Sequence, residues 1–163
     1  DRMKAQDYID KTREYLDYLA EHINNVKKAF NEVTNACKSL TIVNDDYSWH
    51  TLREQVVWHD VSKFSPEEFI QYRQKFYPID DKEKSYNFDL AWENHKKENS
   101  HHHEVIKDFL DVFHMVVDWT AMGYKFGDTA QSFYEKNKKK IKLSKEHEEF
   151  MYEIFNCIKS YKG

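Results

Sequence analysis

Residues 5–39 read AQDYIDKTREYLDYLAEHINNVKKAFNEVTNACKS and carry the strongest fold signal in the chain. Side chains suited to a core recur there every three or four residues, which is the spacing of an α-helix that buries one face. The segment therefore predicts one long helix with a single buried stripe. The stripe consists of Tyr8, Thr12, Tyr15, Leu19, Ile23, Val26, Phe30, Val33 and Cys37.

The rest of the chain also favours helix over sheet. The 163 residues include only 3 Gly and 2 Pro, which sheet proteins use at their frequent turns. We therefore expect an all-α fold, a single domain over residues 1–163 that forms a bundle of about six to seven helices. Further helices are expected at residues 48–63, 66–76, 87–97, 104–126, 128–140 and 144–161, with a polar loop at 78–85 and with N-caps Ser48, Ser65, Asp128 and Ser144.

Charge, cysteine content and hydropathy restrict the class of protein. The net charge is −4, and glutamates at 146, 148 and 149 offset the lysines between 136 and 142, so we expect no nucleic-acid partner. Two cysteines make no disulfide framework, which is typical of a reduced, cytoplasmic protein. No apolar run approaches the roughly 18 residues of a membrane span, and no signal peptide precedes the first helix, so we expect no membrane partner.

The most specific chemical signal is the sequence His59-Asp60-Val61-Ser62-Lys63. An imidazole nitrogen beside a carboxylate suits Mn, Fe, Co, Ni or Zn better than Ca²⁺. Both side chains can reach one metal only if they converge near the end of their helix. Because a His-Asp pair is common by chance, the motif gains weight only from other candidate ligands along the chain.

Those further candidates are histidines on other helices and at their junctions. His22 lies on the buried stripe of the first helix, and His95 follows Trp92 by three residues. A histidine held in the core by hydrogen bonds is the alternative for each of them. His101 and His102 begin a His-His-His run that could equally be an exposed polar loop.

Asp118 is a candidate ligand because it lies in the apolar sequence Val116-Val117-Asp118-Trp119. Burial of a carboxylate is costly unless it pairs with a base or binds a metal, and a salt bridge to Arg or Lys is the alternative. Trp92 and Trp119 could stack on a nucleobase but are more simply explained as core residues.

The candidates occur in the order His, His-Asp, His, His-His, Asp, which resembles the HD-domain superfamily of metal-dependent phosphohydrolases. Residues 59–63 are similar to its His-Asp-x-Gly-Lys variant, with Ser62 in place of Gly. That variant occurs in cyclic-dinucleotide phosphodiesterases and in the inositol-oxygenase branch, which usually hold two metals. More closely, the chain resembles an uncharacterised family of HD-like proteins from phages and bacteria, over residues 59–69, 88–95, 99–102, 118–122 and 125–127.

The resemblance implies an HD-like helical bundle with one or two divalent transition metal ions (Mn, Fe, Co, Ni or Zn). The implied ligands of a first metal are His22, His59, Asp60 and Asp118. The implied ligands of a second metal are Asp60, as a bridge, His95, and His101 or His102. His114, one helical turn before Asp118, is a further candidate, which we interpret instead as a partner of Asp118.

The implied activity is hydrolysis of a small phosphorylated substrate, most simply a nucleotide, by metal-activated hydroxide. Asp60 and Lys63 are the expected catalytic residues, because the Lys63 ammonium can stabilise charge on phosphoryl oxygens. A solvent-facing lysine is the alternative for Lys63. The candidates for substrate contact are Lys63, Asn99, His103 and Lys125. Two other functions stay open: an HD-type iron oxygenase of the inositol-oxygenase kind, and a non-catalytic nucleotide-binding protein.

Overall fold

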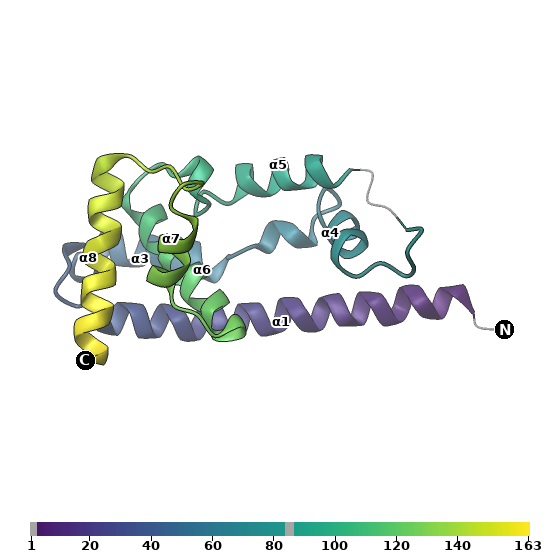
Figure 1. Cartoon of the computed structure of the whole chain (residues 1–163), viewed down its shortest axis with the longest axis horizontal. Coiled ribbons are helices and arrows are strands. Elements are labelled where there is room, and N and C mark those ends of the chain that lie inside the picture. The colour runs from purple at the N-terminus through teal and green to yellow at the C-terminus, as the bar shows by residue number, and fades with distance from the viewer. Residues whose placement is uncertain (1–2, 84–86) are drawn as a thin grey trace. The chain divides into compact units, whose positions relative to one another are not determined.

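The computed structural model describes residues 3–83 and 87–163, and in these ranges it contains helices and no strand (Figure 1). The expectation of an all-α fold is therefore confirmed. The α-helices are α1 (Lys4–Ala36), α2 (Thr41–Asn44), α3 (Asp46–Val57), α4 (Phe69–Phe76), α5 (Phe88–Glu98), α6 (Phe109–Phe126), α7 (Ala130–Asn137) and α8 (Lys145–Lys162). The short 3-10 helices are η1 (Val61–Phe64) and η2 (His103–Val105). None of the described helices is long and apolar enough to cross a membrane.

The chain divides into two compact units, each assembled from two separate stretches. Unit 1 comprises residues 1–22 and 60–99, and unit 2 comprises residues 23–59 and 100–163. Helix α1 therefore contributes to both units, and the second boundary falls between the consecutive residues His59 and Asp60. The assignment of residues 1–163 to a single domain stays a prediction.

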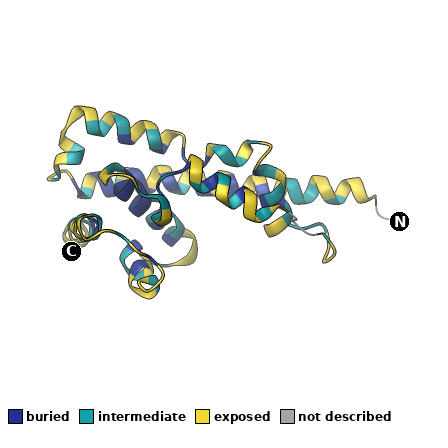
Figure 2. Cartoon of the chain, turned by 90° about the horizontal axis from the view of Figure 1, so that it is seen from above, coloured by how far each residue is buried: buried dark blue, intermediate teal, exposed yellow. Residues whose placement is uncertain are grey.

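Unit 1 has a small aromatic core. Tyr15 and Leu19, one turn apart on α1, are buried with Tyr72 of α4. The Tyr15 ring lies 5.4 Å from the ring of Phe69, and the Tyr72 ring meets Phe88 edge-on at 5.2 Å. Aromatic pairs at these distances add to the stabilisation from burial, so they hold α4 and α5 to the first part of α1. Figure 2 shows α1, which begins at the marked N-terminus, with exposed residues interrupted by more buried ones. Tyr8 and Ile23 are exposed, so their assignment to the buried stripe is wrong.

Helix α6 is the central element of unit 2. Every residue from Asp111 to Val117 is buried, and the helix packs against α3, α7 and α8. Buried polar groups on such a helix need partners within the protein. The Asp111 carboxylate accepts hydrogen bonds from Ser100 Oγ at 2.6 Å and from the Lys107 N–H at 2.8 Å. The remaining buried polar residue of this stretch, His114, contacts other histidines of unit 2 instead.

Side-chain caps set several helix starts differently from the prediction. Helix α3 begins after Asp45, whose carboxylate accepts a hydrogen bond from the Ser48 N–H at 2.8 Å, so the prediction of Ser48 as the N-cap is wrong. Helix α6 begins at Phe109 rather than near residue 104, because Asp108 caps it. For α7 the cap is Thr129, one residue after the predicted one.

The segment around the His-Asp motif also departs from the prediction. Helix α3 ends at Val57, so His59 and Asp60 follow the helix rather than lie on it. Asp60 then adopts a left-handed backbone, and η1 follows at once. Helix α4 begins at Phe69 after Glu68, so the prediction of Ser65 as its N-cap is wrong. Ser65 lies in the turn before the helix, where its carbonyl accepts hydrogen bonds from two successive N–H groups. Residues 84 and 85 of the predicted loop 78–85 lie outside the described residues.

Candidate metal sites

Asp60 is the centre of a buried polar cluster in unit 1. Its Oδ1 lies 3.3 Å from His95 Nε2, and its Oδ2 lies 3.3 Å from Lys63 Nζ and 3.7 Å from His22 Nε2. Asp60, His22 and His95 are all buried. The cluster thus surrounds one carboxylate with an ammonium and two imidazoles, and a neutral imidazole is a metal ligand.

The backbone of Asp60 turns the chain from α3 into η1. Its φ of 56° is the only positive φ of a non-glycine residue in the described ranges. Left-handed backbone costs about 1–2 kcal/mol for most residues, although Asp and Asn tolerate it best. Strain of this kind clusters at functional sites, so the turn is consistent with a functional role for Asp60.

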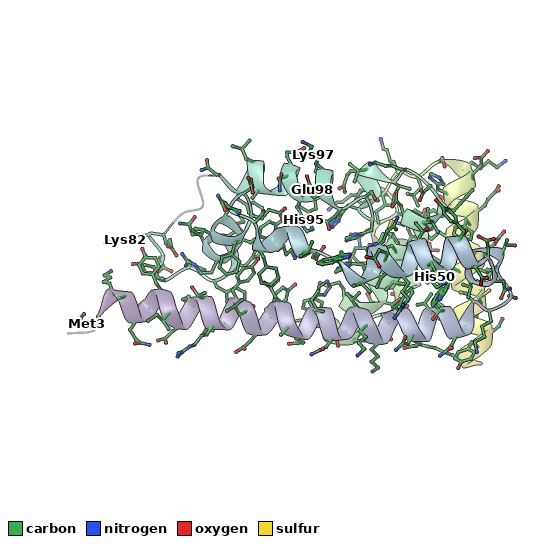
Figure 3. All side chains as sticks on the ribbon, turned by 180° about the vertical axis from the view of Figure 1, so that it is seen from behind. Met3, His50, Lys82, His95, Lys97 and Glu98 are labelled. Atoms are coloured by element: carbon green, nitrogen blue, oxygen red, sulfur yellow. The ribbon has the colours of Figure 1, made fainter. Side chains whose placement is uncertain are left out.

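Glu68 orients His95 within the same cluster. Its fully buried carboxylate accepts hydrogen bonds from His95 Nδ1–H at 2.7 Å and from Asn94 Nδ2 at 2.8 Å. Burial acts to raise the pKa of Glu68, but the hydrogen bonds that its carboxylate accepts, first of all the one from His95, together outweigh burial and lower the pKa. With its proton on Nδ1, His95 directs Nε2 toward Asp60. Figure 3 shows His95 and Lys97 on opposite sides of α5.

Two expected substrate contacts of unit 1 lie beside this cluster. The Lys63 ammonium pairs with Asp60 and only 13% of the side chain is exposed, which argues against the solvent-facing alternative. Asn99 Nδ2 donates hydrogen bonds to Ser62 Oγ and to the His95 carbonyl, each at 2.8 Å. Asn99 therefore ties the end of α5 to η1, a role that the sequence did not suggest.

In unit 2, His59 contacts two side chains of α6. Its Nδ1 lies 2.7 Å from His114 Nε2, and its Nε2 lies 3.2 Å from Asp118 Oδ1. His114 and Asp118 are one turn apart, so α6 presents both on the same face. His59 and His114 are buried, and Asp118 is half-buried. The carboxylate in the apolar stretch of α6 thus has an imidazole partner.

His101 completes a group of three buried histidines, hereafter the histidine group, with His59 and His114. The centre of its ring lies 4.5 Å from that of His59 and 4.2 Å from that of His114. One ring nitrogen of each residue lies within 4.8 Å of those of the other two, close enough to hold a metal ion. The structure therefore favours His114 as a candidate ligand, a role that the sequence also offered but that we set below a partner of Asp118.

His102, His103 and Lys125 lie around the histidine group in different ways. The half-buried ring of His102 lies 4.5 Å from that of His101. His103 forms an ion pair with Glu104. Lys125 is exposed, and its backbone is seven residues, about 10 Å, along α6 from Asp118. The expected substrate contacts of His103 and Lys125 stay predictions.

The sequence of this chain was found to match one family over most of its length. Residues 11–160 match a family of unknown function, DUF5662. The chain belongs to this family. No curated protein and no solved structure matches it. The range matched to DUF5662 contains every candidate ligand, from His22 to Asp118.

The candidate ligands of this DUF5662 chain fall into two groups, one in each unit. Those of unit 1 are His22, Asp60 and His95, and those of unit 2 are His59, His101, His102, His114 and Asp118. Each metal site that the HD resemblance implies takes ligands from both groups, so the complete ligand sets stay predictions. Glu68 is the residue that the sequence analysis missed, because its partner His95 is 27 residues away and no local pattern marks the pair.

Proposed function

We propose that the chain binds a divalent transition metal and hydrolyses a small phosphorylated substrate, most simply a nucleotide. The observation that supports this most strongly is the histidine group of unit 2. Burial of three imidazoles together is costly, and coordination of one metal ion offsets that cost. Imidazole nitrogens are ligands for Zn, Fe, Co, Ni and Mn rather than for Ca²⁺.

The dimensions of the histidine group fit such an ion. Two nitrogens that each lie about 2.0 Å from one tetrahedral ion are about 3.3 Å apart. His59 Nδ1 and His114 Nε2 are 2.7 Å apart, and all three ligand nitrogens lie within 4.8 Å of one another. These separations bracket the roughly 3.3 Å expected for two ligands of one tetrahedral ion, which supports the histidine group as a metal site.

Asp118 fits the role of orienting His59. If His59 coordinates through Nδ1, then Nε2 carries the proton and donates it toward Asp118 Oδ1, 3.2 Å away. A carboxylate in this position holds the ring and makes the imidazole a better ligand. The HD resemblance instead implies that Asp118 is a direct ligand. The loss of metal affinity when Asp118 is replaced distinguishes an orienting residue from a ligand. Loss of an orienting carboxylate weakens metal binding about 10–100-fold, and we expect loss of a ligand to exceed that range.

Asp60 and Lys63 are the catalytic candidates of unit 1. A bound divalent metal supplies hydroxide at neutral pH. The Lys63 ammonium, held 3.3 Å from the Asp60 carboxylate, has little exposure to solvent. Low exposure strengthens the attraction between an ammonium and an anionic phosphoryl oxygen, so Lys63 suits stabilisation of developing charge.

One observation favours an iron oxygenase as a second candidate function. Two histidines and one carboxylate are the donor set of many non-haem iron oxygenases, and unit 1 places His22 and His95 beside Asp60. Iron content and oxygen consumption separate the two functions. Iron-loaded protein that hydrolyses a phosphate ester and consumes no oxygen would exclude the oxygenase.

Metal content is the first test of the proposed function. Wild type, His101→Ala, His114→Ala and the control His50→Ala are incubated with Mn, Fe, Co or Zn, desalted and analysed by mass spectrometry. His50 is exposed on α3 (Figure 3) and is not one of the candidate ligands. We expect comparable metal in wild type and His50→Ala, and at least about tenfold less in the other two variants. Full metal retention by His101→Ala and His114→Ala would overturn the proposed site.

Turnover is the second test. Metal-loaded protein is assayed against nucleotide mono-, di- and cyclic phosphates, and Asp60→Asn and Lys63→Ala are compared with wild type. We expect phosphate release that both variants reduce by about 100-fold or more, as for groups that act on the transition state. Absence of turnover with every substrate, in protein shown to hold metal, would overturn the hydrolase. Tight nucleotide binding in that case would identify a non-catalytic nucleotide-binding protein.

A further inference from the structure

A cavity of about 350 Å³ lies within unit 2 between α1 and α3, and His59 is part of its wall. Cavities of this size hold small organic ligands. Its α1 side extends from Ile23 to Asn31, and its α3 side extends from Trp49 to Val57. His59 belongs both to this wall and to the histidine group, so the cavity reaches the proposed metal site.

One end of the cavity is aromatic. The rings of Phe30 and Trp49 stack with their centres 5.0 Å apart and their planes at 8°. Phe30 is buried, whereas Trp49 is only partly buried. A planar ring that enters this end therefore meets an aromatic surface, against which it can pack favourably.

The middle of the cavity carries positive charge. Lys27 of α1 and Arg53 of α3 both line it, and both are exposed. The described residues of the wall include no Asp or Glu. In a chain with a net charge of −4, this local excess of cations favours an anionic ligand.

These features are arranged in order along the two helices. Trp49 stands at the aromatic end, Arg53 one turn further, and Val57 near His59 at the other end. Val57 is eight residues after Trp49, which corresponds to about 12 Å along the helix axis. A ligand with a planar ring, a negative group and the length of a mononucleotide matches this order.

We infer that the cavity binds an aromatic organic phosphate, with its ring against Trp49 and its negative charge between Lys27 and Arg53. The assignment rests on the proposed function only for the step after binding, namely hydrolysis beside His59. Binding itself depends on the cavity wall alone.

AMP is the probe, adenosine represents its ring without the phosphate, and inorganic phosphate represents the anion without the ring. Calorimetric titration of metal-free protein measures the dissociation constant of each. We expect AMP to bind at least about tenfold more tightly than either fragment, because the cavity recognises both parts. Equal affinity for AMP and one fragment, or no AMP binding at millimolar concentration, would overturn the assignment.

A charge-matched pair of double variants tests the residues. Lys27→Gln with Arg53→Gln removes both cations of the cavity. Arg13→Gln with Lys38→Gln removes the same charge at exposed positions outside it. We expect the double variant at Lys27 and Arg53 to bind AMP about tenfold more weakly than wild type, and the double variant at Arg13 and Lys38 to bind it less than about twofold more weakly. All four side chains are exposed, and circular dichroism checks that both proteins remain folded. Equal effects of the two pairs would contradict the assignment.

Hydrolysis assays separate failure of this inference from failure of the proposed function. AMP binding that requires Lys27 and Arg53, without turnover by metal-loaded protein, supports the cavity and counts against the hydrolase. Turnover of AMP with the same KM in both double variants supports the hydrolase and overturns the cavity assignment.

Discussion

His95 donates its Nδ1–H to Glu68 across 2.7 Å, and both side chains are buried. The bond assigns one tautomer to the ring and leaves Nε2 facing Asp60 Oδ1 at 3.3 Å. Burial lowers the pKa of His95, but hydrogen bonds to Asp60 and Glu68 outweigh it and raise the pKa, so the oriented ring becomes a ligand when Nε2 loses its proton. Glu68 therefore connects the packing of unit 1 with the chemistry proposed for Asp60.

Replacement of Glu68 tests this connection. We expect Glu68→Gln to lower the free energy of unfolding by about 1–3 kcal/mol, because buried hydrogen bonds to His95 and Asn94 are weakened. Urea denaturation measures the loss, and the ¹⁵N shifts of His95 report its tautomer. Glu67→Gln, at the exposed neighbouring position, is the control and is expected to change stability by less than about 0.5 kcal/mol. A stable Glu68→Gln protein with an unchanged His95 spectrum would contradict the role of Glu68.

The left-handed backbone of Asp60 predicts an unusual order of stability. Asp60→Gly and Asp60→Ala both remove the carboxylate, but only glycine adopts a φ of 56° without strain. We expect Asp60→Gly to be more stable than Asp60→Ala by about 1 kcal/mol, measured by urea denaturation. Equal stability, or greater stability of the alanine variant, would show that the turn relaxes when the carboxylate is lost.

The ion pair between Arg73 and Glu83 predicts a pH dependence of stability in unit 1. The two side chains are almost fully buried and share hydrogen bonds of 2.6 and 2.8 Å. The hydrogen bond from Arg73 lowers the pKa of Glu83 and outweighs the effect of burial. Because the folded pKa lies below the unfolded one, the pair stabilises the fold above the unfolded pKa. That stabilisation is lost as pH falls through the folded pKa.

Glu83→Gln should therefore lower the free energy of unfolding at pH 7 by about 3 kcal/mol, since it leaves the buried Arg73 guanidinium without its charge partner. The difference from wild type should shrink as the pH falls below about 4.5, where the unfolded-state carboxyl titrates. Denaturant unfolding at several pH values measures both effects. Asp81→Asn, at an exposed nearby position, is the control. A difference that stays constant with pH would mean that the charge of Glu83 does not matter.

Metal binding at the histidine group predicts a gain in thermal stability. A metal that binds only the folded state raises the free energy of unfolding by about 2.7 kcal/mol at 100 times its dissociation constant. Zinc or manganese should therefore raise the melting temperature of wild type and His50→Ala but not that of His114→Ala. Calorimetry with and without a chelator measures the shift. An equal shift in all three proteins would place the metal elsewhere.

Local signals in the sequence were sufficient to predict where some helices begin and end, but not others. The stripe of α1 predicted that helix almost to its ends, and Ser144 caps α8 as expected. Gly127 ends α6 with a φ of 71°, a conformation that glycine adopts readily. The predicted end of α3, at residue 63, was wrong. Helical periodicity in the sequence continues through residues 58–63, but the helix ends at Val57 and the chain turns at Asp60.

The sequence by itself determined the all-helical architecture and the candidate donor residues, because periodicity, capping and side-chain chemistry are properties of short segments. Only the tertiary structure decided which of those side chains meet. His59 and His114 are 55 residues apart in the chain, and Glu68 and His95 are 27 apart. Such contacts arise when helices that are distant in sequence bury their faces against each other. No periodic pattern in one segment records which residue of another segment will lie opposite it.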